Sequence, residues 1–283
     1  MRALLALVGI SLGLACSEPY AARGGSGGPP PAPASTQAPD PAAEPPTAEP
    51  PAPVVDDPKA GDVHYVELVL GGAAADATLP MVVAIHGLGD DPRNFGHLFE
   101  SFSSPVRLIL PRGLESREAG GYSWFPLRAR DPDVAALAQG IAQAADRLAV
   151  AIDTLARTRP TAGKPIVTGF SQGGMLSFAI AVRHPESISL ALPIGGWLPP
   201  PLWPTTAAAA KAPRIVAFHG TDDGAVKFEP TERAVDELRK HGWPIELHAY
   251  PGVGHVITPE IHRDLDDALD DGVRAIAKAK PRP

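Results

Sequence analysis

The 283-residue chain contains 34 prolines and 28 glycines, and its formal net charge is −7. This negative charge, without a run of Lys or Arg, excludes the concentrated positive surface that nucleic-acid binding requires. Every apolar run falls well short of the roughly 20 residues that a membrane-spanning helix needs.

The N-terminus has the pattern of an export signal. Arg2 supplies a positive charge, and the apolar stretch that follows it predicts a signal peptide over residues 1–15. Cys16, the single cysteine, comes directly after Gly13-Leu14-Ala15, which resembles a bacterial lipobox whose thiol is acylated after cleavage. We therefore expect lipid attachment at Cys16, and anchoring to the bacterial outer membrane by that lipid alone. The alternative is cleavage without acylation, which gives a periplasmic or secreted protein.

A proline-rich segment separates this signal from the rest of the chain. Twelve prolines lie between Pro29 and Pro58 with no Ile, Leu, Phe, Trp or Tyr among them. Such a segment cannot bury enough apolar surface to offset the entropy lost on ordering, so residues 16–58 are predicted to be a disordered linker. Residues 59–283 have ordinary hydrophobic content and a length that suits one α/β domain with a single core.

Strand and helix patterns alternate through this domain. Apolar or β-branched runs predict strands, and apolar positions three and four residues apart predict helices. In chain order, the patterns first predict strands at 63–70, 81–85 and 106–110, and then a helix that is capped by Asp131 and runs to about residue 155. A strand at 165–170 and a helix at 172–184 follow, and then strands at 188–194 and 215–219. The last predicted elements are a helix at 230–241, a strand at 245–250 and a helix at 259–279. This alternation predicts a mainly parallel central sheet flanked by helices on both faces, with functional residues at the carboxyl ends of its strands.

The clearest functional motif follows the strand at 165–170. The sequence Gly169-Phe170-Ser171-Gln172-Gly173 has the G-x-S-x-G pattern and lies between a buried strand and an apolar helix. That context is typical of a nucleophile elbow, in which a strained turn presents the serine and the flanking residues lack side chains that would clash. Ser171 is therefore the predicted nucleophile, and a structural serine in an ordinary turn is the alternative.

A serine nucleophile needs a base and an acid. His255 is the predicted base, because it lies in a glycine-containing loop just after the last predicted strand, within reach of the carboxyl edge of the sheet. Asp222 and Asp223 both follow the strand at 215–219, and their position alone does not choose which of them orients the imidazole. The order Ser, Asp, His along the chain is that of α/β-hydrolases.

Two backbone N–H groups are predicted to form an oxyanion hole. One belongs to Gln172, which follows the nucleophile and opens a helix whose positive dipole end faces the site. The other is assigned to Leu88, in the glycine-bearing loop after the strand at 81–85.

Five motifs in this order resemble the phospholipase/carboxylesterase family, which includes acyl-protein thioesterases and small bacterial carboxylesterases. They are His86-Gly87-Leu88-Gly89-Asp90, Gly169-Phe170-Ser171-Gln172-Gly173-Gly174, Gly196-Trp197-Leu198-Pro199, His219-Gly220-Thr221-Asp222-Asp223 and Gly252-Val253-Gly254-His255. The resemblance extends over about residues 63–276 and implies an α/β-hydrolase fold. The family's His-Gly-x-x-Asp pattern implies that the acid is Asp223.

The substrate is expected to be a small or medium ester. Trp124, Phe125, Trp197 and Leu198 fall in loops near the strand ends and are predicted to line its pocket, with packing in the core as the alternative. The gaps between predicted elements reach only about 20 residues, which excludes a large cap domain. The sequence contains no recognised metal or cofactor motif, so neither is predicted, and it makes no prediction of oligomeric state.

The sequence as a whole predicts a serine hydrolase that cleaves carboxylic esters through an acyl-enzyme intermediate. Because His255 must be neutral to act as a base, activity is predicted to fall as the pH falls through roughly 6 to 7. Hydrolysis of acyl thioesters, lysophospholipids or feruloyl-type esters is the nearest alternative. A non-catalytic, anchored binding protein is the alternative of a different class.

Overall fold

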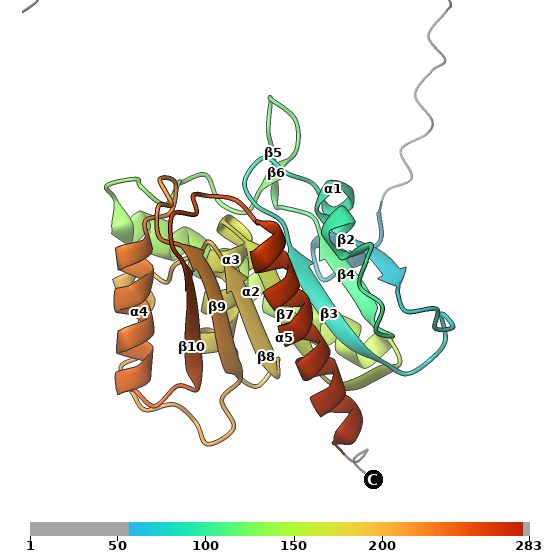
Figure 1. Ribbon diagram of the computed structural model, residues 1–283. Coiled ribbons are helices and arrows are strands. Elements are labelled where there is room, and N and C mark those ends of the chain that lie inside the picture. The colour runs from blue at the N-terminus through green and yellow to red at the C-terminus, as the bar shows by residue number, and fades with distance from the viewer. Residues whose placement is uncertain (1–56, 280–283) are drawn as a thin grey trace, which may run out of the picture. The chain divides into compact units, whose positions relative to one another are not determined.

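A computed structural model describes residues 57–279 of the chain (Figure 1). The predicted signal peptide, Cys16 and nearly all of the predicted linker lie outside the described residues. The last two linker residues, Asp57 and Pro58, contact the domain: the Pro58 carbonyl accepts the Tyr65 N–H at 3.0 Å, and Asp57 pairs with Arg93 at 3.0 Å. These contacts place both residues with the domain, two positions before its predicted start.

Eight strands form the central sheet, in the order β1-β2-β4-β3-β7-β8-β9-β10. Six of them run parallel: β3 (Leu79–Ile85), β4 (Arg107–Pro111), β7 (Thr161–Phe170), β8 (Leu190–Ile194), β9 (Arg214–Gly220) and β10 (Ile245–Tyr250). At one edge, β2 (Val63–Val69) pairs antiparallel with β4, and β1 (Lys59–Ala60) pairs antiparallel with β2. The mostly parallel sheet confirms the predicted fold class.

Helices cover both faces of the sheet. On one face, α2 (Val134–Thr158), α3 (Gln172–Arg183) and α4 (Phe228–Lys240) contribute apolar side chains to a shared core. On the other face, α1 (Pro92–Gly96), the 3₁₀ turn η1 (His97–Phe99) and α5 (Pro259–Lys278) cover a second core. In Figure 1, α5 crosses in front of the sheet, and α2 and α3 lie behind it. Among the helices of residues 57–279, none combines the length and the apolar character that crossing a membrane requires.

Several short elements were not predicted. They are β1, α1 with η1, the small hairpin of β5 (Glu115–Ser116) and β6 (Tyr122–Ser123), and the 3₁₀ turn η2 (Pro200–Leu202). Elements of two to five residues are too short to produce a periodic sequence pattern. Within residues 57–279 no separate cap domain covers the sheet, in agreement with the short gaps in the sequence.

The helix α2 begins two residues later than predicted. Asp133 is its N-cap, and the Oδ1 atom of this residue accepts the N–H of Ala136 at 2.9 Å. Asp131, the predicted cap, instead accepts the backbone N–H of Arg128 and closes the turn before the helix. Both aspartates have the side chain that an N-cap needs, so the local sequence does not choose between them.

The parallel strands bring four loops to one edge of the sheet. All seven residues of β3 and all five of β8 are buried, which explains why these strands read as continuous apolar runs. Because the strands are parallel, the loops after β3, β7, β9 and β10 all leave at the carboxyl edge. These loops carry the predicted functional residues.

Candidate active site

Ser171 lies in the turn between β7 and α3, with φ 59° and ψ −114°. It is the only residue other than glycine with a positive φ among those that the structure describes. Such a backbone conformation costs about 1–3 kcal/mol and persists only where surrounding contacts enforce it. Here the Ser171 N–H donates to the carbonyl of Ile194, and the Ser171 carbonyl accepts the Met175 N–H, both at 3.0 Å.

Two glycines allow β3 to pack directly against this turn. A Cβ atom on Gly173 would lie 1.9 Å from the carbonyl oxygen of Ile85, and one on Gly169 would lie 2.6 Å from the same oxygen. No other residue fits at either position. The close approach sets the loop after β3 beside Ser171.

Ser171, His255 and Asp223 form a continuous hydrogen-bonded chain. The Ser171 hydroxyl lies 2.9 Å from His255 Nε2, and His255 Nδ1 lies 2.7 Å from Asp223 Oδ2. A carboxylate only accepts hydrogen bonds, so Nδ1 carries the ring proton and Nε2 accepts the serine hydroxyl. The His255 ring also stacks on Phe170, with 4.6 Å between ring centroids, which fixes its plane.

Asp223 is buried and is held by several donors. Its Oδ1 accepts the N–H groups of Ala225 and Val226 at 2.9 and 2.8 Å, and His219 Nε2 lies 3.4 Å from its Oδ2. Burial alone would raise the pKa of Asp223, but hydrogen bonds from the two histidines and a backbone N–H outweigh burial and hold this pKa well below the usual aspartate range. The carboxylate therefore stays charged at neutral pH.

Only one of the two adjacent aspartates contacts the histidine. Asp222 is exposed, and its carboxylate accepts the Thr221 hydroxyl at 3.1 Å. The structure thus brings Asp223, the residue that the family pattern implies, to His255 and leaves Asp222 away from it.

Leu88 and Gln172 line a cavity of about 210 Å³ together with Ser171 and His255. Gln172 is the first residue of α3, so its N–H has no acceptor within the helix. Within the described part of the chain, the Leu88 N–H donates no backbone hydrogen bond either, whereas the next N–H, of Gly89, donates to Tyr122 at 2.8 Å. Both N–H groups are available to an oxygen atom bound in the cavity.

The side chain of His86 fixes the loop that carries Leu88. It is fully buried, its Nδ1 donates to the Gly87 carbonyl at 2.7 Å, and its Nε2 accepts the Gly113 N–H at 3.0 Å. Burial lowers the pKa of His86, and this outweighs the opposite effects of the Gly87 hydrogen bond and of nearby aspartates. His86 is therefore a neutral imidazole with its proton on Nδ1.

The side chain of Gln172 ties the turn at Ser171 to a neighbouring loop. Its Oε1 accepts the Trp124 N–H at 3.0 Å, and its Nε2 donates to the Phe125 carbonyl at 2.9 Å. The indole N–H of Trp124 in turn donates to the His86 carbonyl at 3.0 Å. Sequence reasoning used only the backbone N–H of Gln172, because nothing in the sequence pairs its side chain with a loop 47 residues away.

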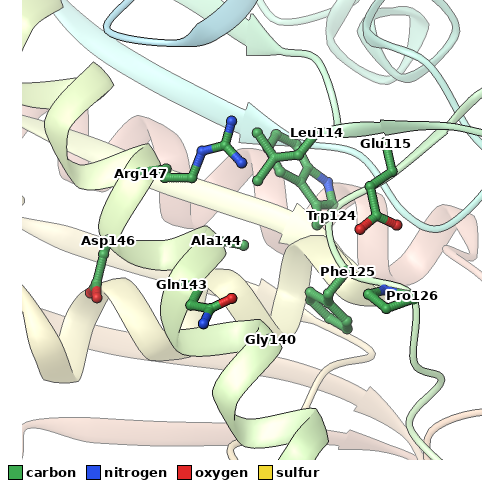
Figure 2. A pocket seen from close by; sticks show the side chains of 10 residues that line it. All are labelled: Leu114, Glu115, Trp124, Phe125, Pro126, Gly140, Gln143, Ala144, Asp146 and Arg147. Atoms are coloured by element: carbon green, nitrogen blue, oxygen red, sulfur yellow. The ribbon is translucent and has the colours of Figure 1, made fainter.

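The four residues predicted to line the substrate pocket lie elsewhere. Trp124, Phe125, Trp197 and Leu198 are buried in the core on the α2 and α3 face, and none of them lines the cavity at Ser171. Trp124 and Phe125 instead border a second hollow of about 450 Å³ against α2, which shares no lining residue with the first (Figure 2). The pocket assignment was wrong because large apolar side chains near strand ends gain more from core burial than from a place in an open cavity.

Other side chains line the cavity at Ser171 in place of these four. They are Arg128, Ala129, Arg130, Met175, Ala225 and Val226. Within residues 57–279, no group of three or more His, Cys, Asp or Glu side chains is arranged to hold a metal ion.

Known proteins are similar to this chain in sequence and in fold. Acyl-protein thioesterase 1 of Mycosarcoma maydis is 26% identical over 216 residues, which are 68% of this chain and 90% of that protein. Carboxylesterase SOBER1 of Arabidopsis thaliana is 35% identical over 94 residues, which are 32% of this chain and 41% of that protein. The crystal structure of esterase PE8 matches with a TM-score of 0.63 at 25% identity, over 74% of this chain and 98% of the esterase. Residues 72–271 match the sequence pattern of the phospholipase/carboxylesterase family, and the chain belongs to that family.

Proposed function

We propose that the protein is a serine hydrolase of carboxylic esters in which Ser171 is the nucleophile. One observation carries the proposal: an unbroken hydrogen-bonded chain runs from the Ser171 hydroxyl through His255 to the buried Asp223, beside a cavity. Membership of the phospholipase/carboxylesterase family supports the same reaction.

In the first half of the reaction, the ester carbonyl lies in the cavity with its oxygen between the N–H groups of Leu88 and Gln172. Ser171 Oγ attacks the carbonyl carbon while His255 Nε2 takes the hydroxyl proton. Negative charge develops on the carbonyl oxygen, and two N–H donors together with the N-terminus of α3 stabilise it. The imidazolium then gives its proton to the leaving alcohol, and the acyl group remains on Ser171.

In the second half, water replaces the alcohol. His255 takes a proton from the water, the resulting hydroxide attacks the acyl carbon, and the proton returns to Ser171 as the acid leaves. Asp223 keeps the imidazole in the tautomer that accepts at Nε2 and stabilises its charged form in both halves. Hydrogen bonds from His255, His219 and backbone N–H groups keep the proton affinity of Asp223 low despite its burial.

Hydrolysis of 4-nitrophenyl esters from acetate to palmitate tests the proposal. We expect turnover by the wild-type protein, and a loss of several orders of magnitude in Ser171→Ala, because the strained turn and the oxyanion donors remain while the nucleophile is absent. Labelling by a fluorophosphonate probe provides an independent readout, because it requires the activated serine but no ester pocket. Equal turnover by the wild type and by Ser171→Ala would contradict the proposal.

Thioester hydrolysis is the second candidate, favoured by the acyl-protein thioesterase of Mycosarcoma maydis, of which the alignment covers 90%. The same residues and the same acyl-enzyme serve both reactions, because only the leaving group differs. A comparison of kcat/KM for matched butyryl esters and butyryl thioesters separates them.

We infer from the sequence that the protein is exported and anchored by a lipid on Cys16. The lipobox-like Gly13-Leu14-Ala15-Cys16 after the apolar stretch supports this inference. Expressed in a Gram-negative host, the wild-type chain is expected in the outer-membrane fraction, and Cys16→Ser in the soluble periplasmic fraction. The same distribution for both chains would rule out the anchor.

A further inference from the structure

The cavity at Ser171 has a positively charged lining. Among the described residues that line it are two arginines, Arg128 and Arg130, and no aspartate or glutamate. The chain as a whole has a net charge of −7. The local excess of positive charge is therefore not a consequence of composition.

Neither guanidinium group forms an ion pair with a carboxylate within residues 57–279. Other arginines of the domain do form ion pairs: Arg147 lies 2.7 Å from Asp62, and Arg183 lies 2.9 Å from Asp146. The aspartates nearest to the two cavity arginines along the chain are engaged with backbone groups instead. Asp131 accepts the backbone N–H of Arg128, and Asp133 caps α2.

The position of these arginines does not help α2 to form. They precede the N-terminus of this helix, where the helix dipole is positive and a positive side chain is unfavourable. Their charge is therefore available to a bound molecule.

The segment that carries the arginines is fixed to the nucleophile turn. Leu127 and Ala129, which alternate with the arginines, pack against the core. The side chain of Gln172 donates to the Leu127 carbonyl at 3.3 Å, in addition to its bond to Phe125. The two arginines are thus presented to the cavity by a segment that is bonded to the residue following Ser171.

We propose that Arg128 and Arg130 make the enzyme selective for esters that carry an anionic group, a carboxylate or a phosphate, close to the scissile bond. This inference rests on the proposed function. A guanidinium group binds both anions through paired, charge-assisted hydrogen bonds, which a neutral ester cannot form. The apolar side chains of Met175 and Val226 in the same lining contact the hydrocarbon part of such a substrate.

The test compares two substrates that differ in charge and by one methyl group. They are the 4-nitrophenyl monoester of adipic acid, whose free carboxylate is ionised, and the same compound with that carboxylate methylated. The measured quantity is the ratio of kcat/KM for the charged substrate to kcat/KM for the neutral one. Active-site titration with a fluorophosphonate normalises each enzyme to its folded, reactive fraction.

We expect the wild-type ratio to favour the charged substrate, and the double variant Arg128→Gln/Arg130→Gln to lower that ratio by at least about 10-fold, mainly through KM. Raising the ionic strength should lower the wild-type ratio as well, because salt screens the attraction. Arg157→Gln is the matched control, because this exposed arginine lies in the last turn of α2, more than six helical turns from its N-terminus, and should keep the wild-type ratio.

A second pair of substrates distinguishes where the anion lies. Glycerol 3-phosphate monobutyrate carries the charge in the alcohol part, and glycerol monobutyrate is its neutral counterpart; butyrate release is measured for both. The inference is supported if, for either pair of substrates, the double variant lowers the ratio of kcat/KM. The pair whose ratio falls shows whether the arginines bind an anion in the acyl part or in the alcohol part of the ester.

Two results would contradict the inference. Turnover of the neutral esters with ratios that the double variant leaves unchanged overturns the inference and leaves the proposed function intact. Absence of turnover for every ester, charged or neutral, overturns the proposed function and the inference with it.

Discussion

Asp223 and Asp222 are adjacent carboxylates with opposite surroundings, and this difference makes a sharp test at the scale of single residues. Asp223→Asn should lower kcat/KM on the order of 10³- to 10⁴-fold, because an amide that donates toward His255 stabilises the wrong tautomer. Asp222→Asn should stay within about two-fold of the wild type, because Asp222 is exposed and, among the described residues, its carboxylate accepts a hydrogen bond from Thr221 alone. Steady-state kinetics with 4-nitrophenyl butyrate measures both. A larger loss in Asp222→Asn than in Asp223→Asn would show that the acid has been misassigned.

The buried His86 should make stability depend on pH. Its pKa is lowered in the folded state, mainly by burial, whereas an unfolded histidine takes up a proton below about pH 6.5. The unfolded state then binds more protons than the folded state, so the free energy of unfolding should fall as the pH falls from 7 to 5.5. Asp223 contributes nothing in this window, because its lowered pKa adds stability above about pH 4 that is lost only at lower pH.

Urea denaturation at pH 7.5, 6.5 and 5.5 measures this dependence. His86→Gln should be less stable than the wild type at pH 7.5 but should lose less stability between pH 7.5 and 5.5. Long-range ¹H–¹⁵N spectra of the wild type give a second readout, in which the His86 ring should take up its proton at a lower pH than an unfolded histidine does. A folded protein in which the His86 ring is protonated at the same pH as an unfolded histidine would contradict the account.

Single residues were predictable from sequence where the chemistry is local. Ser171 lies between two glycines at a strand end, and that spacing reports the strained turn directly. The arginines of the cavity and the side chain of Gln172 have no such pattern, because their roles come from loops that meet only in the fold. Trp124 shows the converse case, since its sequence position near a strand end suggested a pocket and its burial places it in the core.

The junction of β3, β7 and α3 is the structural element on which the site depends, and Gly173 is the residue that tests it. Gly173→Ala would place a methyl group 1.9 Å from the carbonyl oxygen of Ile85, a backbone atom that cannot move away cheaply. We expect a loss of about 3 kcal/mol or more in stability, or failure to fold. Gly224→Ala is the matched control, because no atom lies within 4 Å of its added carbon, and it should stay within about 0.5 kcal/mol. The urea midpoints decide, and equal midpoints would mean that β3 does not pack on the turn as described.

Elements were predictable where burial gives them a long pattern. The strands β3 and β8 are buried along their whole length, and α2, α4 and α5 each bury one apolar face, so these elements appear in the sequence near their observed bounds. The strand β7 begins four residues earlier than predicted, because its first four residues are only half-buried or exposed and give no apolar run. The start of α2 was misplaced because Asp131 and Asp133 have equal capping chemistry, and only the fold determines which one caps. The hairpin of β5 and β6 consists of two-residue strands held by contacts with the loop after β3, which no local pattern encodes.

For the whole molecule, strand–helix alternation predicted the class of sheet but not its order. In the sheet, β4 and β2 lie on one side of β3, and β7 to β10 lie on the other side. This order depends on which strands pair in the fold, and the alternation of strands and helices along the chain does not determine it. That order puts the loops after β3 and β7 side by side at the centre of the sheet, where Leu88 and Ser171 meet. The family resemblance implied an α/β-hydrolase fold, whereas residue periodicity alone does not encode the strand order.

The start of the folded domain can be located by two truncations that differ by six residues. Removal of residues 1–56 should leave stability within about 0.5 kcal/mol of the signal-cleaved protein and ester turnover within about two-fold, because a proline-rich segment without large apolar residues adds no core. Removal of residues 1–62 also deletes the Pro58 bond to Tyr65, the Asp57 pair with Arg93 and the pairing of β1 with β2.

The free energy of unfolding of the longer truncation should therefore be about 2 kcal/mol lower than that of the shorter one, because each hydrogen bond that is lost contributes about 1 kcal/mol. It should still turn over esters below its unfolding transition, since Ser171, Asp223 and His255 all come from later elements. Urea midpoints of the three chains, measured with their kcat/KM values, separate these expectations. If removal of residues 1–56 alone costs more than about 1 kcal/mol, then the proline-rich segment packs on the domain and is not merely a linker. Equal stability for both truncations would instead move the start of the domain beyond β1.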